Sequence, residues 1–98
     1  MFELVYHTQW PAGVLPFAEV DPDTFAIFAE WRRTFPGLIS FQATRPNELS
    51  LNGYHRFDSE ESCSEFEEAL LTQPQRVIQS NYEHTVGLTR TVMFRGPI

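Results

Sequence analysis

The chain has 98 residues, enough for one domain with its own core, and no apolar run approaches the ~18–20 residues that span a membrane. Lysine is absent and Cys63 is the only cysteine, which excludes a P-loop, a Schiff-base lysine, an internal disulfide and a cysteine-cluster metal site. The net charge of −6 lies within residues 58–68, because the remaining acids balance the seven arginines, so no basic patch for a nucleic acid is expected.

A first strand is predicted over residues 2–10, where apolar and polar side chains alternate. One face would carry Phe2, Leu4, Tyr6, Thr8 and Trp10, and the other Glu3, Val5, His7 and Gln9. The N-terminus lacks the basic and apolar regions of a signal peptide, so a cytoplasmic protein is expected. Residues 14–20 then form an apolar, proline-containing connection, which we expect to pack on the domain as a lid or an edge.

A first helix is predicted from Asp21, a good N-cap residue followed by proline at the first helical position, up to Pro36-Gly37. Its main stripe, at helical spacing, consists of Phe25, Phe28, Arg32 and Phe35. Ile27 and Trp31 form a second apolar stripe, which we expect to face a ligand cavity or a subunit partner.

A tight hairpin follows, with strands over residues 38–45 and 49–57 that are joined by a turn at Pro46 and Asn47. Gly53, in the middle of the second strand, indicates either a bulge or the close approach of another group. Asp58 is predicted to cap a second helix, with Glu61 completing a capping box, and Gln73-Pro74 to end it. This helix has one acidic, solvated face.

The last part of the chain is predicted to hold a short helical turn at residues 76–78 and a long strand over residues 83–94. One face of that strand would carry His84, Val86, Leu88, Arg90, Val92 and Phe94. The resulting order, β-α-β-β-α-β, predicts a ferredoxin-like α+β fold: a four-stranded antiparallel sheet with two helices on one face, in a single domain over residues 1–98.

Two stretches carry a family resemblance, residues 36–41 (Pro-Gly-Leu-Ile-Ser-Phe) and residues 54–61 (Tyr-His-Arg-Phe-Asp-Ser-Glu-Glu), with Phe66 in the helix that follows. Together with the order of elements, they resemble the dimeric α+β barrel superfamily, and its antibiotic-biosynthesis-monooxygenase type in particular. Members usually carry tryptophan at the position of Phe57, and the connection over residues 11–20 is longer than is usual in the family.

The resemblance implies a homodimer in which two sheets pack face to face, and a small aromatic or apolar ligand in the cleft between helices and sheet. The free sheet face would include Ser50, Asn52, Thr85, Thr89 and Thr91. Heme-degrading members use an asparagine, a tryptophan and a histidine at positions that fall here near Tyr6 or His7, at Phe66 and near Arg76. Since none of these matches, heme degradation is not expected, and no cofactor is predicted.

His55 and His7 are the candidate catalytic residues, because histidine is the side chain whose ordinary pKa lies nearest neutrality. For His55, on an apolar strand face beside Phe57, the alternative is a buried structural role. Arg32 either extends to solvent or meets an anionic ligand group, and Arg90 needs a partner if it is buried. The histidines lack metal-ligand spacing, so no metal site is predicted. The candidate substrate-binding residues are Tyr6, Phe28, Trp31, Arg32, Phe66, His84 and Arg90.

Two functions remain open from the sequence. The first is a cofactor-independent monooxygenase-like or isomerase-like enzyme acting on an aromatic or polyketide-like molecule, in which a histidine accepts a proton and an arginine stabilises an enolate or phenolate. The second is a non-catalytic ligand-binding or protein-interaction module of the same fold.

Overall fold

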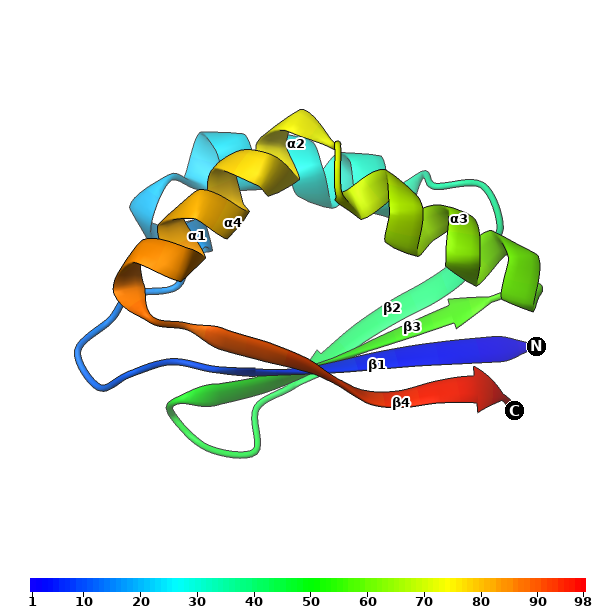
Figure 1. Cartoon of the computed structure of the whole chain (residues 1–98), viewed down its shortest axis with the longest axis horizontal. Coiled ribbons are helices and arrows are strands. Elements are labelled where there is room, and N and C mark those ends of the chain that lie inside the picture. The colour runs from blue at the N-terminus through cyan, green and yellow to red at the C-terminus, as the bar shows by residue number, and fades with distance from the viewer.

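The computed structural model of the chain describes residues 1–98 and contains one antiparallel sheet of four strands, in the order β2-β3-β1-β4. Four helices lie on one face of this sheet (Figure 1). The strands are β1 (Phe2–Gln9), β2 (Leu38–Thr44), β3 (Ser50–Phe57) and β4 (Thr89–Pro97). The helices are α1 (Phe17–Val20), α2 (Pro22–Arg33), α3 (Glu60–Leu70) and α4 (Pro74–Val86). The predicted ferredoxin-like α+β fold is confirmed, and the sheet of one chain stays open.

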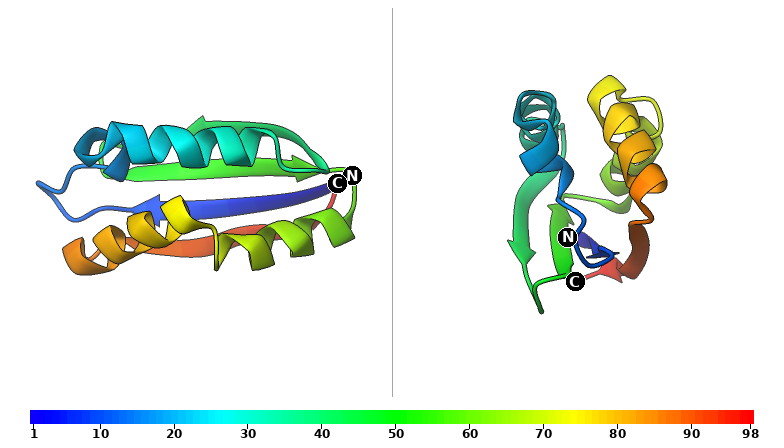
Figure 2. Two further views of the ribbon diagram at one scale, coloured as in Figure 1. Left: turned by 90° about the horizontal axis from the view of Figure 1, so that it is seen from above. Right: turned by 90° about the vertical axis from the view of Figure 1, so that its left-hand side faces the viewer.

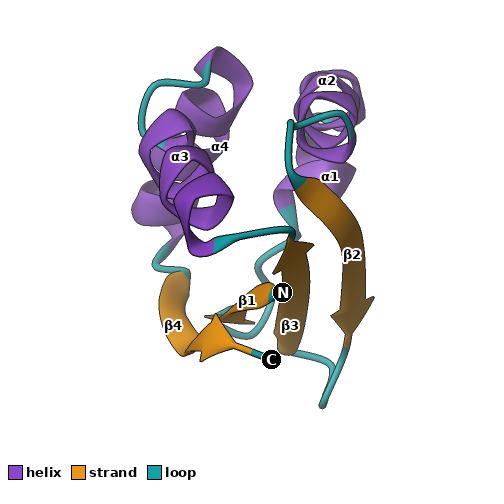
Figure 3. Cartoon of the chain, turned by 90° about the vertical axis from the view of Figure 1, so that its right-hand side faces the viewer, coloured by secondary structure: helices purple, strands orange, loops and turns teal.

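The helices form two pairs. In Figure 2 and Figure 3, α1 and α2 lie over β2 and β3, while α3 and α4 lie over β4 and β1. This division follows from the strand order. The first helix pair connects β1 to β2 and the second connects β3 to β4, and in both cases the two strands are not neighbours in the sheet, so the connection crosses the sheet face.

The core fills the end of the sheet near α3. Its fully or almost fully buried members are Phe2, Leu4, Phe57, Cys63 and Phe66. Phe66 of α3 lies at the centre: its ring is 5.3 Å from the ring of Phe57 on β3, 5.2 Å from Phe35 after α2, and stacked 5.8 Å from Trp31 on α2. Aromatic burial at this point thus holds both helix pairs on the sheet.

The prediction for residues 71–88 was wrong. Instead of a short turn and the start of a strand, they contain α4, a helix of 13 residues. Its start is marked by the side chain of Gln73, which accepts from the backbone of Arg76, and by Pro74 at the first helical position; its end is Gly87 in the left-handed conformation. The apparent alternation near Val86 was therefore accidental, and β4 begins only at Thr89.

Two smaller expectations need correction, and two others are confirmed. The cap of α3 is Ser59, whose hydroxyl accepts from the backbone of Ser62, while Asp58 accepts from the Ser62 hydroxyl at 2.6 Å. The connection over residues 14–20 packs on the domain as expected, with Phe17 buried, and it contains the short helix α1. A bulge between β1 and β4 places Phe94 opposite Val5, on the sheet face away from the helices, whereas one continuous face from residue 84 to 94 had been expected. The predicted cap of α2 by Asp21 is present.

Both the backbone conformation and the close packing at position 37 require glycine. Its φ is +88°, and an added Cβ would lie 2.6 Å from Ser62 Cβ and closer still to Ser62 Oγ. Gly13 has a similar φ of +83°, but an added Cβ there would meet nothing within 4 Å. The two glycines therefore separate the cost of the backbone conformation from the cost of close packing.

We expect Gly37→Ala to lower the free energy of unfolding by about 2–5 kcal/mol, from ~1–2 kcal/mol for the left-handed backbone and ~1–3 kcal/mol for the clash with Ser62. The control Gly13→Ala should cost only the backbone part, about 1–2 kcal/mol. Urea denaturation of the two variants measures this difference. Equal losses would show that the contact of Gly37 with α3 does not constrain the fold.

Candidate ligand-binding pocket

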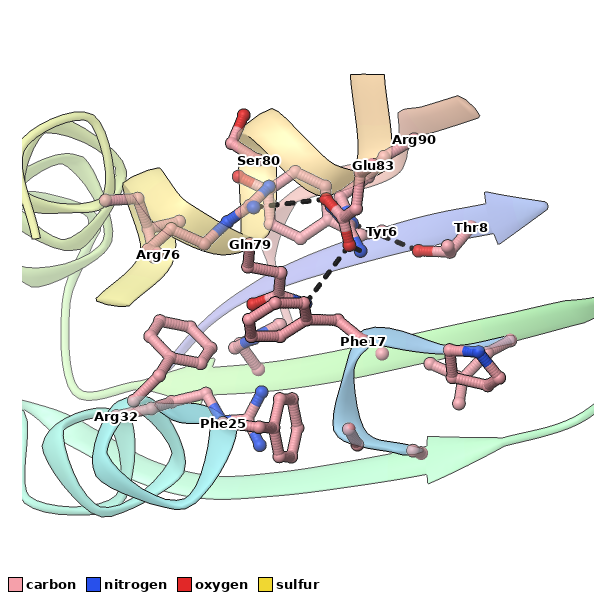
Figure 4. A pocket seen from close by; sticks show the side chains of 18 of the residues that line it. Tyr6, Thr8, Phe17, Phe25, Arg32, Arg76, Gln79, Ser80, Glu83 and Arg90 are labelled. Atoms are coloured by element: carbon pink, nitrogen blue, oxygen red, sulfur yellow. Dashed lines mark hydrogen bonds and ion pairs between the residues drawn. The ribbon is translucent and has the colours of Figure 1, made fainter. Parts of the chain in front are cut away.

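A cavity of about 680 Å³ opens between the two helix pairs and the sheet. Its walls are mainly apolar, with aromatic rings from α1, α2, β2 and α3: Phe17, Phe25, Phe28, Phe41 and Phe66. Figure 4 shows polar side chains that enter it from α2 and α4. The size and the mixture of apolar walls with few polar groups are typical of small-molecule sites.

His55 of β3 lies in the floor of this pocket, only 5% exposed. Its ring is 4.8 Å from the ring of Phe41 and 5.3 Å from that of Phe66. Its Nδ1 lies 3.2 Å from the carbonyl oxygen of Leu4, which can only accept, so Nδ1 donates and Nε2 carries the lone pair. Gly53 allows this packing, since an added Cβ would lie 3.3 Å from the Phe41 ring; the register through Gly53 is unbroken.

The His55 imidazole is neutral over the physiological range. Burial lowers the pKa of His55 to about 4, and the positive charge of Arg32 acts in the same direction. The backbone carbonyls of Leu4 and Gly53 oppose this shift only in part. His55 is therefore a neutral proton acceptor in a dry site, and a weak one.

Arg32 of α2 brings an unbalanced positive charge into the pocket. Its guanidinium carbon lies 3.8 Å from the centre of the Phe41 ring and 5.3 Å from that of Phe28, and no carboxylate pairs with it. Burial, with the charge of Arg90, lowers the pKa of Arg32 to about 10, so it remains charged at neutral pH. A cation that is held on aromatic faces and lacks an anion is a site for an anionic ligand group.

Glu83 of α4 organises the opposite wall. This carboxylate is 5% exposed and accepts from Arg76 Nη1 at 3.1 Å, from Gln79 Nε2 at 3.1 Å and from both terminal nitrogens of Arg90. Arg90 also donates from Nε to Thr8 Oγ1 at 3.1 Å, which joins α4 to β4 and β1. Burial opposes ionisation, but the hydrogen bonds and charges of the two arginines outweigh it and lower the pKa of Glu83.

Two buried polar atoms of the pocket wall have no hydrogen-bond partner, Gln79 Oε1 and Trp10 Nε1. Leaving a buried donor or acceptor unpaired costs about 1–3 kcal/mol each. Such atoms are uncommon in folded proteins, and their position in a pocket makes a ligand a candidate partner.

Several residues expected to bind a ligand lie in this pocket. Tyr6, Phe28, Arg32, Phe66 and Arg90 line it together with His55. Burial, with the charge of Glu67, raises the pKa of Tyr6, so this phenol stays neutral. The chain thus brings together most of the residues that the sequence suggested.

Three predicted site residues lie elsewhere. His7 is on the sheet face away from the helices, because it alternates with Tyr6 along β1, and its Nδ1 is 2.7 Å from Asn52 Oδ1. His84 lies exposed in the last turn of α4, since the segment is a helix. Trp31 is part of the core, stacked on Phe66 and Phe28. Thr85, expected on the free sheet face, also belongs to α4.

Glu83 and Gln79 were not identified from the sequence. Arg76, Gln79 and Glu83 are spaced by three and four residues, so they share a face of a helix. That spacing becomes a signal only once the segment is known to be helical, and the cap at Gln73 with Pro74 could have shown this.

The side chains bring no three His, Cys, Asp or Glu residues together in an arrangement for a metal ion. None of the helices combines the length and apolar character needed to cross a membrane.

In sequence, the chain matches no family model and no curated protein. In structure, it is similar to a protein from Deinococcus radiodurans that is provisionally described as an antibiotic biosynthesis monooxygenase, with a TM-score of 0.65 and 12% identity over 100% of this chain and 95% of that one. This chain thus shares the fold of the Deinococcus protein. Two further structures share this fold. Protein Atu4242 from Agrobacterium tumefaciens has a TM-score of 0.62 and 13% identity over 96% of this chain and 92% of that one. Rv0793 from Mycobacterium tuberculosis has a TM-score of 0.56 and 18% identity over 100% and 96%.

The buried imidazole of His55 leads to a prediction about the stability of this domain. Because the pKa of His55 falls from 6.5 in the unfolded chain to about 4 in the folded one, its contribution is complete above pH 6.5 and is lost as the pH falls towards 4. We expect the free energy of unfolding to fall by about 3 kcal/mol more in the natural protein than in His55→Gln between pH 7 and pH 4. Urea denaturation at both pH values measures this, and equal pH dependence would contradict a neutral buried His55.

Proposed function

We propose that the chain binds a planar aromatic or polyketide-like molecule that carries an acidic group, and that this group lies against Arg32. The observation that carries the proposal is the unpaired charge of Arg32 within an apolar, ring-lined cavity of about 680 Å³. The aromatic walls would pack on the ligand ring, while the guanidinium would neutralise a phenolate, enolate or carboxylate.

The reaction that this arrangement supports is cofactor-independent monooxygenation. His55 Nε2 accepts a proton from an acidic ring hydroxyl or methylene, and Arg32 stabilises the resulting phenolate or enolate. The electron-rich anion then reacts with dioxygen, which the proposal takes as the second substrate and the only oxidant. The organic substrate supplies all four electrons and two hydrogens: a ring methylene becomes a carbonyl, or a hydroquinone becomes a hydroxyquinone, with one oxygen atom, and the other oxygen atom leaves as water. The low polarity of the pocket strengthens the attraction between the anion and Arg32.

The weak basicity of His55 sets a condition on this chemistry. With a pKa of about 4, the imidazole alone is a poor acceptor for a phenol proton. An anion beside the ring favours the protonated imidazole, so proton transfer and the formation of the anion support each other. The pair that reacts is therefore His55 together with the ligand anion held by Arg32.

The same observation favours the second candidate function, a non-catalytic ligand-binding module. A histidine that is buried among rings and bonded to the Leu4 carbonyl has no acidic residue to raise its basicity. In that case the pocket would bind its ligand without turnover, and His55 would serve packing. The protein-interaction version of this function would use the acidic face of α3.

We further propose that two copies pair through the open sheet face. This face carries the His7–Asn52 hydrogen bond, together with Val5 and Phe94, which lie opposite each other on β1 and β4; Phe94 is 42% exposed. A second sheet would cover these apolar side chains, as the fold type implies. A homodimer and a cytoplasmic location stay predictions from the sequence.

If Arg32 binds the acidic group of the ligand, removing the charge of this one side chain should greatly weaken ligand binding. We expect Arg32→Gln to weaken the binding of 2-naphthoate by about 10- to 100-fold, because the ligand loses its charge-assisted hydrogen bonds. Arg33→Gln is the matched control, since Arg33 is exposed and already paired with Glu30. Isothermal titration calorimetry measures both variants; an unchanged affinity in Arg32→Gln would overturn the anion site.

The catalytic version predicts that His55→Gln loses turnover and keeps binding. Oxygen uptake with hydroquinones and anthrone-like polyketides should fall by about 10²- to 10⁴-fold, the usual contribution of a general base. His84→Gln, exposed on α4, is the control. If the natural protein binds these compounds but consumes no oxygen, the non-catalytic function is the correct one.

A further inference from the structure

Gln79 presents an unused hydrogen-bond acceptor in the pocket wall. The side chain is only 8% exposed, and its Oε1 has no partner in the protein. Figure 4 shows it extending from α4 into the pocket, with its amide nitrogen towards Glu83 and its amide oxygen on the other side.

The orientation of this amide follows from its neighbour. Gln79 Nε2 donates to Glu83 Oε2 at 3.1 Å, and Glu83 is held as a carboxylate by Arg76 and Arg90. A flipped amide would place its carbonyl oxygen against that carboxylate, with two acceptors in contact and no proton between them. The two arginines therefore act through Glu83 to keep Oε1 directed away from the network.

We propose that Gln79 Oε1 accepts a hydrogen bond from a hydroxyl group of the ligand, and that the ligand is a hydroxylated aromatic acid. This inference rests on the proposed function, since the acidic group lies against Arg32. The two groups come from facing walls, Arg32 from α2 and Gln79 from α4, so a ring system between them meets a cation and an acceptor.

Burial makes this acceptor selective. In the free protein, Oε1 is shielded from solvent, so a ligand hydroxyl can bind it only if a pocket side chain moves as the ligand enters. An ordinary ligand hydrogen bond replaces one to water and gains little, whereas this acceptor has no water to give up. A ligand without a donor leaves the atom unpaired, as before binding. The site therefore distinguishes a hydroxyl from groups of similar size.

The second unpaired atom, Trp10 Nε1, leads to a different expectation. The indole nitrogen only donates, so it would select a ligand acceptor such as a carbonyl or an ether oxygen. A methyl ether keeps the acceptor of a phenol and loses its donor. Comparing a hydroxyl with its methyl ether therefore tests Gln79 and is indifferent to Trp10.

The experiment measures the binding of hydroxynaphthoates that differ in the ring position of the hydroxyl, each beside its methyl ether, by calorimetry. We expect at least one hydroxynaphthoate to bind the natural protein about tenfold more tightly than its ether. Gln79→Met should abolish this preference by weakening the hydroxyl compound alone. Gln75→Met is the control, because Gln75 lies on the same helix outside the pocket and should keep the preference.

The outcomes separate the two proposals. If hydroxynaphthoates and ethers bind equally, or if the preference survives Gln79→Met, the role of Gln79 is overturned while the Arg32 site stands. If no naphthoate binds, the anion site itself fails. Should Gln79→Met not fold, Gln79→Lys makes the same test, since lysine still donates to Glu83 but offers no acceptor. Its added charge affects both members of each pair, so the ratio of their affinities remains the readout.

Discussion

The carboxylate of Glu83 receives hydrogen bonds from Arg76 and Gln79 on its own helix and from Arg90 on the neighbouring strand. A buried carboxylate must be paired, because an isolated charge in a dry interior is far too costly. The hydrogen bonds to Glu83 therefore hold α4 over β4 and β1. They also occupy Arg76 and Arg90, two of the three arginines that line the pocket. Arg32 is the one left without an anion, and this remainder gives the pocket its positive character.

The pocket exists because the aromatic packing of the core ends before the sheet does. On one side of Phe66, rings from both helix pairs and from β3 pack with their centres 5.2–5.8 Å apart. Helix α3 ends at Leu70, and a new helix, α4, begins at Pro74. The side of α4 that faces the pocket carries polar side chains in place of aromatic rings. One half of the sheet is thus covered by the aromatic core, and the other half by a mainly apolar cavity whose α4 wall carries the polar side chains. His55 lies at the boundary, and this explains why it is both buried and lining the pocket.

Sequence patterns identified the sheet, α2, α3 and six of the residues that line the pocket, because alternation and helical spacing report which side chains share a face. They failed where two periodicities overlap. The segment up to Val86 reads equally as a strand, and only the Gln73 cap, Pro74 and the left-handed Gly87 show that it is a helix. Because this segment was predicted as a strand, His84 was expected in the cleft, and Glu83 and Gln79 were not recognised as pocket residues. His7 failed for a simpler reason: which face of β1 meets the helices is decided by packing.

The sequence by itself determined the topology of this protein and the absence of a lysine or a cysteine pair from its chemistry, since both follow from local patterns and composition. Only the tertiary structure decided which charges are paired. Arg32, Arg76 and Arg90 are the same residue type in the sequence, yet two of them are paired with one carboxylate and the third has none. Pairing depends on distances between segments that are far apart in the chain, and the same distances direct the Gln79 amide and hold His55 neutral.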